Sequence, residues 1–188
     1  MRVIAGSARR LTLKTIEGMD TRPTTDRIKE TLFNILQPEL LDCHFLDLFS
    51  GSGAIGIEAL SRGAAKAVFV DNSKEALSCI RQNLEKTHLA DRAIVIGQDC
   101  AGAIHALDAK KMHFDIIFMD PPYQLNAEKE VLTAIADSKI ADEDTQIIIE
   151  ATLDREFSED ELACFDVVRV KEYKTNKHIF LQKSSREA

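Results

Sequence analysis

Residues 45–56 read FLDLFSGSGAIG, and this stretch decides the fold class of the chain. Its first half is mostly apolar, which predicts a buried strand. Gly51, Gly53 and Gly56 follow with the G-x-G-x-x-G spacing of a glycine loop that opens a helix, and Gly63 is placed to end that helix. A strand, a glycine loop and a helix in this order predict the first unit of an open, mostly parallel sheet.

Strands and helices alternate along the rest of the chain. After the first strand at 45–49, apolar runs predict strands over 67–70, 93–96, 114–119 and 146–149. Helices are expected over 54–62, from Ser73 onward, near 101–107 and near 127–137. Two final strands, joined by a tight turn, are expected over 164–172 and 177–183. This alternation predicts an α/β fold with helices on both faces of a mostly parallel sheet, and the last two strands can form an antiparallel pair at its edge.

The N-terminal part has a different pattern. Short extended pieces are expected around Gly6, and a helix follows them. Thr24 or Thr25 can cap that helix, Asp26 suits its positive first turn, and Pro38 ends it. Its expected apolar face consists of Ile28, Leu32, Ile35 and Leu36.

The composition is that of an ordinary globular domain, with 45% apolar and 29% charged residues in a chain of 188. We expect one domain over 1–188, in which 1–25 form a basic N-terminal extension and 26–188 the α/β core. No apolar run approaches the roughly 20 residues of a membrane helix, and the N-terminus lacks the apolar region of a secretory signal, so a cytoplasmic protein without membrane contact is expected. The four cysteines and five histidines show no metal-binding spacing, so no metal site is expected.

Charge is distributed unevenly along the chain. The net charge is −7, but residues 1–36 carry +3 and residues 169–183 carry +4, which leaves −14 for residues 37–168. Basic ends on an acidic core suit a protein that contacts nucleic-acid phosphates with its edges, and an unevenly charged solvated surface is the alternative. The candidate phosphate contacts in the N-terminal extension are Arg9, Arg10 and Lys14.

Two acidic residues indicate which cofactor the glycine loop holds. Asp71 lies 20 residues past Gly51, which satisfies the dinucleotide fingerprint with its ribose-binding acid. Asp47 lies four residues before Gly51, and a carboxylate there would repel a pyrophosphate but favour a positively charged cofactor. S-adenosylmethionine carries an ammonium and a sulfonium and is therefore the expected cofactor. The alternative for Asp47 is a carboxylate that only braces the loop.

The remaining cofactor contacts are expected after the next strands. Asp99 can accept a hydrogen bond from the adenine amino group, with backbone contact from Cys100, and a helix cap is the competing role for Asp99. The complete expected set is Asp47, Phe49, Gly51, Ser52, Gly53, Asp71, Asn72, Asp99, Cys100 and Asp120.

The motif Asp120-Pro121-Pro122-Tyr123 directly follows an apolar strand and is the expected reaction site. Two prolines stiffen the loop and remove two amide donors. An exocyclic amine on a base is a poor nucleophile, because its lone pair is delocalised into the ring. The Asp120 carboxylate and the Pro121 carbonyl can hold its N–H groups, the carboxylate can take up the released proton, and Tyr123 can stack on the base. A rigid turn that merely ends a strand is the alternative.

These motifs together resemble the RsmD family. The residues that carry the resemblance are Arg2–Gly6, Thr21–Arg27, Leu46–Gly53, Glu58–Ala64 and Asp120–Tyr123. The resemblance implies methylation of N2 of one guanine in 16S ribosomal RNA, guanine 966. It also implies a seven-stranded class I methyltransferase sheet with an N-terminal β-hairpin, and it implies that Arg22, Pro23 and Thr24 border the cofactor and RNA cleft.

This chain departs from the family pattern at three places. Ser50 and Asp71 stand where alanine and glutamate are usual, and both changes keep the chemistry. The turn over 173–176 lacks the expected glycine, which puts the shape of the last hairpin in doubt.

Other functions and substrates compete with this interpretation. They are a DNA methyltransferase acting on adenine N6 or cytosine N4, a nicotinamide-dependent oxidoreductase, and a non-catalytic RNA-binding module. The expected partner is 16S ribosomal RNA, either naked or within the assembling small subunit.

Overall fold

The computed structural model describes residues 1–16, 26–122 and 127–184. In these ranges the helices are α1 Asp26–Leu36, α2 Ala54–Ser61, α3 Lys74–Thr87, α4 Cys100–Ala109 and α5 Ala127–Ala136, with short 3-10 helices η1 Gln37–Glu39 and η2 Ala90–Arg92. The strands are β1 His44–Leu48, β2 Lys66–Asp71, β3 Ala93–Gly97, β4 Ile116–Met119, β5 Gln146–Thr152, β6 Phe165–Glu172 and β7 Asn176–Lys183. The expected helices and strands from residue 26 onward are confirmed, with small differences at their ends.

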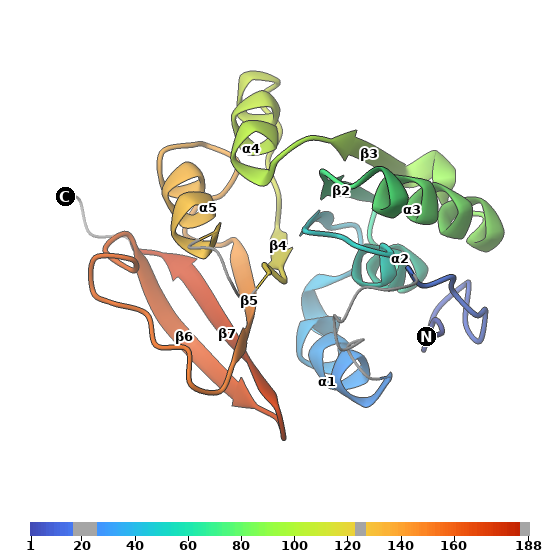
Figure 1. Ribbon diagram of the computed structural model, residues 1–188, viewed down its shortest axis with the longest axis horizontal. Helices are drawn as coiled ribbons and strands as arrows, with labels where there is room; N and C mark the ends of the chain where they lie inside the picture. Colours follow the sequence, from blue (N-terminus) through green and yellow to red (C-terminus); the bar gives the residue numbers. More distant parts are fainter. Residues whose placement is uncertain (17–25, 123–126, 185–188) are drawn as a thin grey trace.

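The strands form one sheet in the order β3-β2-β1-β4-β5-β7-β6 (Figure 1). The pairs β3–β2, β2–β1, β1–β4 and β4–β5 are parallel, whereas β5–β7 and β7–β6 are antiparallel. The expected α/β class, with an antiparallel pair at one edge, is therefore confirmed. The strand order reverses between β1 and β4, and in open sheets this is the place where ligands bind.

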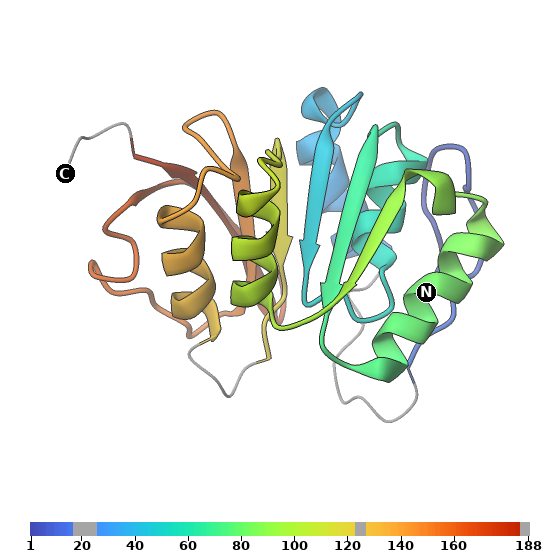
Figure 2. The same cartoon turned by 90° about the horizontal axis from the view of Figure 1, so that it is seen from above.

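Helices cover both faces of the sheet. Alternate side chains of each strand point to opposite faces, so the apolar strands contribute to two hydrophobic cores, one on each face of the sheet. The first core joins the sheet to α1, α2 and α3 through Phe45, Phe69, Phe118 and Phe180. The second joins it to α4 and α5 through Leu46, Val68, Ile117 and Ile149. Figure 2 shows α4 and α5 side by side on this second face.

The C-terminal hairpin forms without a glycine in its turn. Asn176 begins β7, and its carbonyl accepts a hydrogen bond from the Tyr173 amide at 2.8 Å, which closes the turn. β7 then pairs with β5, with Glu150 opposite His178. The hairpin therefore continues the main sheet, and its inner strand reaches the part of β5 that lies next to the carboxyl end of β4.

The N-terminal β-hairpin implied by the resemblance is not confirmed. The extension folds back on itself, but within residues 1–16 its β pairing is a single bridge between Arg2 and Thr12. Backbone hydrogen bonds also cross between its two ends, from the Val3 amide to Leu11 and from the Arg10 amide to Val3, both at 2.9 Å. At the last turn of α2, Ser61 accepts from the amides of Ser7 at 2.8 Å and Ala8 at 3.0 Å, and these bonds hold the segment against the core.

The expected apolar face of α1 is confirmed at Leu32 and Leu36, which are fully buried. Ile35 is partly buried and packs against the first core, and Ile28 is also partly buried. Lys29 is fully buried in the same helix, which an apolar periodicity could not predict. A lysine is rarely buried without a partner, so its environment must supply one.

Glu58 on α2 is that partner. Its carboxylate lies 3.2 Å from Lys29 Nζ and 2.8 Å from Arg62 Nε, and it accepts hydrogen bonds from the amides of Ile4 and Ala5 at 2.8 and 3.0 Å. One buried carboxylate thus joins α1, α2 and the N-terminal extension. Burial lowers the pKa of Lys29, and the attraction of Glu58 opposes this shift.

We predict that Glu58→Gln lowers the free energy of unfolding by about 3–5 kcal/mol, because it leaves buried cations without their counter-charge. Urea unfolding monitored by circular dichroism measures this loss. Glu85→Gln, the same change at an exposed position of α3, should stay within about 0.5 kcal/mol of the parent. Equal losses in the two variants would contradict the role given to Glu58.

Candidate active site

Four acidic side chains lie along the carboxyl ends of four adjacent parallel strands. Asp47 lies in β1, Asp71 ends β2, Asp99 follows β3 and Asp120 follows β4. The register places Asp47 opposite Phe118, two residues before Asp120. The structure therefore brings these predicted residues to one edge of the sheet, at the reversal of strand order.

The glycine loop leaves β1 through an unusual backbone. Phe49 has a φ of 57°, a region that favours glycine, and Gly51 and Gly53 follow with φ of 53° and 76°. A Cβ added at Gly51 would meet no atom within 4 Å, so the loop borders open space there. Strained non-glycine backbone of this kind is concentrated at ligand-binding loops.

Gly56 serves packing and not ligand access. A Cβ at this position would lie 2.4 Å from Cε1 of Phe69, so only glycine lets α2 pack this closely on β2. At Gly53 the same atom would lie 3.2 Å from the Ile80 side chain. The three glycines of the motif thus differ in role: Gly51 lines open space, and the other two allow close contacts.

Asp47 is buried, with 1% of its surface exposed. Its Oδ2 accepts a hydrogen bond from the Gly56 amide at 2.9 Å, which is the loop-bracing role considered as an alternative. Burial raises the pKa of Asp47 to about 8; the Gly56 hydrogen bond opposes this shift and the charge of Asp71 adds to it. Attraction of a cationic cofactor by Asp47 stays a prediction.

Asp71 holds the glycine loop from the neighbouring strand. Its Oδ2 accepts from the Gly51 amide and its Oδ1 from the Ser73 amide, both at 2.9 Å. Ser73 itself caps α3 by accepting from the Ala76 amide at 3.3 Å, so the cap expected at Ser73 is confirmed. A carboxylate has about four lone-pair positions, so Asp71 can accept further donors.

Asp99 caps α4. Its Oδ1 accepts from the Gly102 amide at 2.7 Å, which is the competing role recognised in the sequence. Asp99 is exposed, as is Asn72 after β2, whereas Cys100 is buried at the start of α4. The contact of Asp99 with adenine stays a prediction.

Asp120 lies between the two halves of the sheet. It is partly buried, Pro121 after it is buried, and Pro122 is exposed. Burial raises the pKa of Asp120 well above its usual range, and the charges of Glu150 and Asp47 raise it further. Several predicted residues lie outside the described part of the chain: Arg22, Pro23, Thr24, Thr25 and Tyr123.

The sequence reasoning missed a polar cluster on β5 and the C-terminal hairpin. Glu150 Oε2 lies 3.2 Å from His178 Nε2, and its Oε1 accepts from Asn176 Nδ2 at 2.5 Å. Tyr173 Oη lies 3.1 Å from His178 Nδ1. Glu150 follows the apolar run Ile147–Ile149 just as Asp120 follows an apolar strand, and this signal could have identified it.

The structure separates the predicted basic residues. Asn83 donates to the carbonyls of Lys14 at 3.0 Å and Ser52 at 2.9 Å, so Lys14 lies beside the glycine loop. Arg9 and Arg10 are exposed near the opposite end of α2, roughly one helix length or about 12 Å away. Of the three residues, Lys14 alone has its backbone beside the glycine loop, and its ammonium group donates to Gln82 Oε1 on α3 at 3.0 Å.

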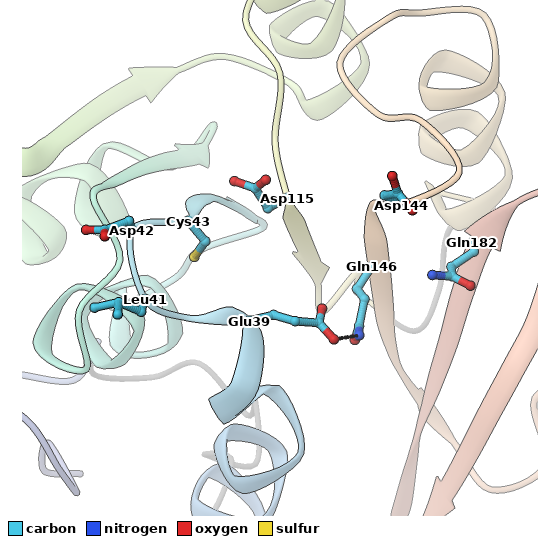
Figure 3. Close-up of a pocket in the computed structure, with 8 residues that line it drawn as sticks. All are labelled: Glu39, Leu41, Asp42, Cys43, Asp115, Asp144, Gln146 and Gln182. Atoms are coloured by element: carbon cyan, nitrogen blue, oxygen red, sulfur yellow. Dashed lines mark hydrogen bonds between the residues drawn. The ribbon is translucent and has the colours of Figure 1, made fainter.

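A hollow lies at the edge of the sheet opposite the candidate site (Figure 3). Its volume is about 470 Å³, and it is lined by Glu39, Leu41, Asp42, Cys43, Asp115, Asp144, Gln146 and Gln182. It faces the amino ends of the parallel strands, away from the glycine loop. Its four carboxylates would repel phosphates, so it is not the candidate site.

The described residues contain neither a metal-binding group nor a helix that could cross a membrane. Within them, no three histidine, cysteine or acidic side chains form a group that could hold a metal ion. None of the helices described is both long and apolar enough to cross a membrane. The four cysteines are free thiols.

Each comparison with known proteins matches most of the chain. The family model described as conserved hypothetical protein 95 matches residues 1–182. YlbH of Bacillus subtilis (strain 168), named as a candidate rRNA methyltransferase, is 42% identical over 80% of this chain and 82% of its own. Ribosomal RNA small subunit methyltransferase D of Escherichia coli (strain K12) is 34% identical over 82% of this chain and 76% of its own. Among solved structures, Escherichia coli yhhF, named as a candidate methyltransferase, has a TM-score of 0.82 at 30% identity over 99% of each chain.

We predict that Asp47→Asn flattens the pH dependence of stability in the ligand-free protein. The pKa of Asp47 is about 8 when folded and about 3.9 when unfolded, so the folded protein holds one extra proton between these values. The contribution of this group to the free energy of unfolding therefore falls as pH rises from about 4 to about 8, by on the order of 1 kcal/mol per pH unit. Asparagine removes this fall and still accepts from Gly56.

Urea unfolding at pH 5, 6, 7 and 8 tests this prediction. The variant should gain stability over the parent as pH rises. Parallel stability curves for the two proteins would show that Asp47 ionises as easily in the folded state as in the unfolded state.

Proposed function

We infer that the chain, which belongs to the RsmD family described as conserved hypothetical protein 95, methylates the exocyclic N2 amine of one guanine in small-subunit ribosomal RNA. The observation that carries this inference is the Asp120-Pro121-Pro122 loop beside the glycine loop and Asp71, at the reversal of strand order. The ribosomal RNA methyltransferases among its relatives support the substrate class. The choice of guanine N2 follows the family resemblance.

The residues present fit S-adenosylmethionine. Open space borders Gly51, so a ligand can lie close to the backbone there. The Asp71 carboxylate can accept the two ribose hydroxyls, and Asp99 the adenine amino group. The buried Asp47 carboxylate favours the positive charge of this ligand over a pyrophosphate. When bound, S-adenosylmethionine supplies an electrophilic methyl group.

The reaction loop orients the amine that is methylated. The Asp120 carboxylate and the Pro121 carbonyl accept its N–H groups, which directs the nitrogen lone pair toward the methyl carbon. Asp120 then takes the proton that the methylated amine must lose. We assign Tyr123 to stack on the base, a contact worth about 1–3 kcal/mol. The base must be unpaired or flipped out to reach this loop.

Basic residues supply the contacts to RNA. The backbone of Lys14 lies beside the glycine loop, and we assign its ammonium group to bind a phosphate near the target base in place of Gln82. Arg9 and Arg10, about one helix length away, suit a more distant phosphate. Arg22, Pro23 and Thr24 are assigned to the cleft by the family resemblance. We propose one domain over 1–188, with 1–25 as a basic extension of the catalytic core.

The experiment that tests this function maps the methylated base. Purified protein is incubated with isotopically labelled S-adenosylmethionine and either naked 16S ribosomal RNA or small subunits, both prepared from cells that lack the protein. We expect labelled N2-methylguanosine by nucleoside mass spectrometry. Label in adenine N6 or cytosine N4, or label in duplex DNA alone, would overturn the assignment and favour a DNA amino-methyltransferase.

We predict that Asp120→Ala abolishes this methylation but largely preserves cofactor binding, because Asp120 acts on the base. Calorimetric titration with S-adenosylhomocysteine measures the binding. Asp115→Ala, the same change at the amino end of the same strand, serves as the control and should retain activity. Loss of cofactor affinity in Asp120→Ala equal to its loss of activity would contradict this division of roles.

We predict that Asp71→Ala weakens cofactor binding by ten-fold or more, about 1.4 kcal/mol, because two hydroxyl groups lose a charged acceptor. The same titration measures it, and NAD is titrated in parallel. Parent-like affinity in this variant would refute the ribose assignment. Tight binding of NAD without binding of S-adenosylhomocysteine would favour an oxidoreductase.

A further inference from the structure

Asp120 directly follows β4, and Glu150 and His178 lie on the neighbouring strands β5 and β7. Met119 at the end of β4 is paired with Ile149 of β5, and Asp120 and Glu150 are the next residues along the two segments. Glu150 is in turn paired with His178 of β7. Residues paired in this way point to the same face of a sheet. The three side chains therefore form a row that starts at the reaction loop.

The far end of this row is fixed by hydrogen bonds. Glu150 and His178 are 4% and 0% exposed. An ionised carboxylate only accepts, so Asn176 Nδ2 donates to one oxygen and His178 Nε2 to the other, at 2.5 and 3.2 Å. With its proton on Nε2, His178 accepts from the Tyr173 hydroxyl through Nδ1, at 3.1 Å. The hairpin thus holds both carboxyl oxygens of Glu150 in place.

We propose that Glu150, fixed by Asn176 and His178, is a positioning residue that makes Asp120 the proton acceptor of the methyl transfer. This inference rests on the proposed function. In the step concerned, the methylated amine carries one positive charge and loses one proton. Its N–H bond breaks, the electron pair stays on nitrogen, and the proton goes to an Asp120 oxygen.

The charges around Asp120 explain why a charged neighbour is needed to make Asp120 a proton acceptor. An ordinary aspartate has a pKa near 3.9 and holds a proton weakly at neutral pH. A like charge nearby makes the protonated form more favourable. Glu150 on β5 and Asp47 on β1 both raise the pKa of Asp120, in addition to its burial. Behind Glu150 lie His178 and Tyr173, and the exposed Lys171 of β6 is paired with His178.

The test measures the titration of Asp120 directly, without RNA. The Asp120 carboxyl carbon is followed by ¹³C NMR between pH 3 and 10 and is assigned from its loss in Asp120→Asn. We expect Glu150→Gln to lower the Asp120 midpoint by about one pH unit or more, because a neighbouring negative charge is lost. Glu39→Gln, the same change beside the opposite end of β5, should leave the midpoint in place.

A second uncharged variant, Glu150→Met, covers the case in which Glu150→Gln does not fold. It removes the same carboxyl group and should move the Asp120 midpoint in the same direction. An unchanged Asp120 midpoint in whichever of the two variants folds would overturn the inference.

Single-turnover methylation of 16S ribosomal RNA gives the second readout. The rate in the parent should rise with pH as Asp120 ionises, and in Glu150→Gln this rise should move to lower pH by the same amount as the NMR midpoint. A purely structural role for Glu150 would lower the rate at every pH without moving the rise, and would count against the inference. Absence of methylation by the parent would count against the proposed function alone, because the NMR titration does not depend on it.

Discussion

The hydrogen bond between the Gly56 amide and the buried Asp47 carboxylate is the constraint on which the site depends. It joins the first strand of the parallel sheet to the first turn of α2. That turn can come so close only because Gly56 has no Cβ to meet Phe69. The glycine loop between them is then held from its other side by Asp71. The open space beside Gly51 is a result of this bracing.

The same edge of the sheet gathers acidic side chains. Asp47, Asp120 and Glu150 lie on β1, at the end of β4 and on β5, where apolar side chains would stabilise the fold better. Burial of neighbouring carboxylates opposes folding, because each disfavours ionisation of the next. Departures from favourable packing of this kind are concentrated at functional sites. These acidic side chains would bind a cationic ligand and accept a proton during the reaction.

The N-terminal extension depends on a separate buried charge. Glu58 binds Lys29 and Arg62 and the backbone ahead of them, so α1, α2 and the extension form one unit. The Asn83 side chain then joins the extension to the glycine loop, because it donates to a carbonyl in each. This arrangement places the backbone of Lys14 beside the glycine loop, whereas Arg9 lies near the other end of α2.

The sequence by itself determined the elements and most of the acids of the site. Strand and helix periodicities, the glycine spacing and acids placed after apolar runs are local patterns, and local backbone preferences decide them. Only the tertiary structure decided that Lys29 is buried, that β pairing in the extension is a single bridge, and that Asp47 and Asp99 accept hydrogen bonds from the first turns of α2 and α4. Only the tertiary structure placed His178 beside Glu150, 28 residues away in sequence. The physical reason is that β7 enters between β5 and β6, and such long-range pairing leaves no local signal in either segment.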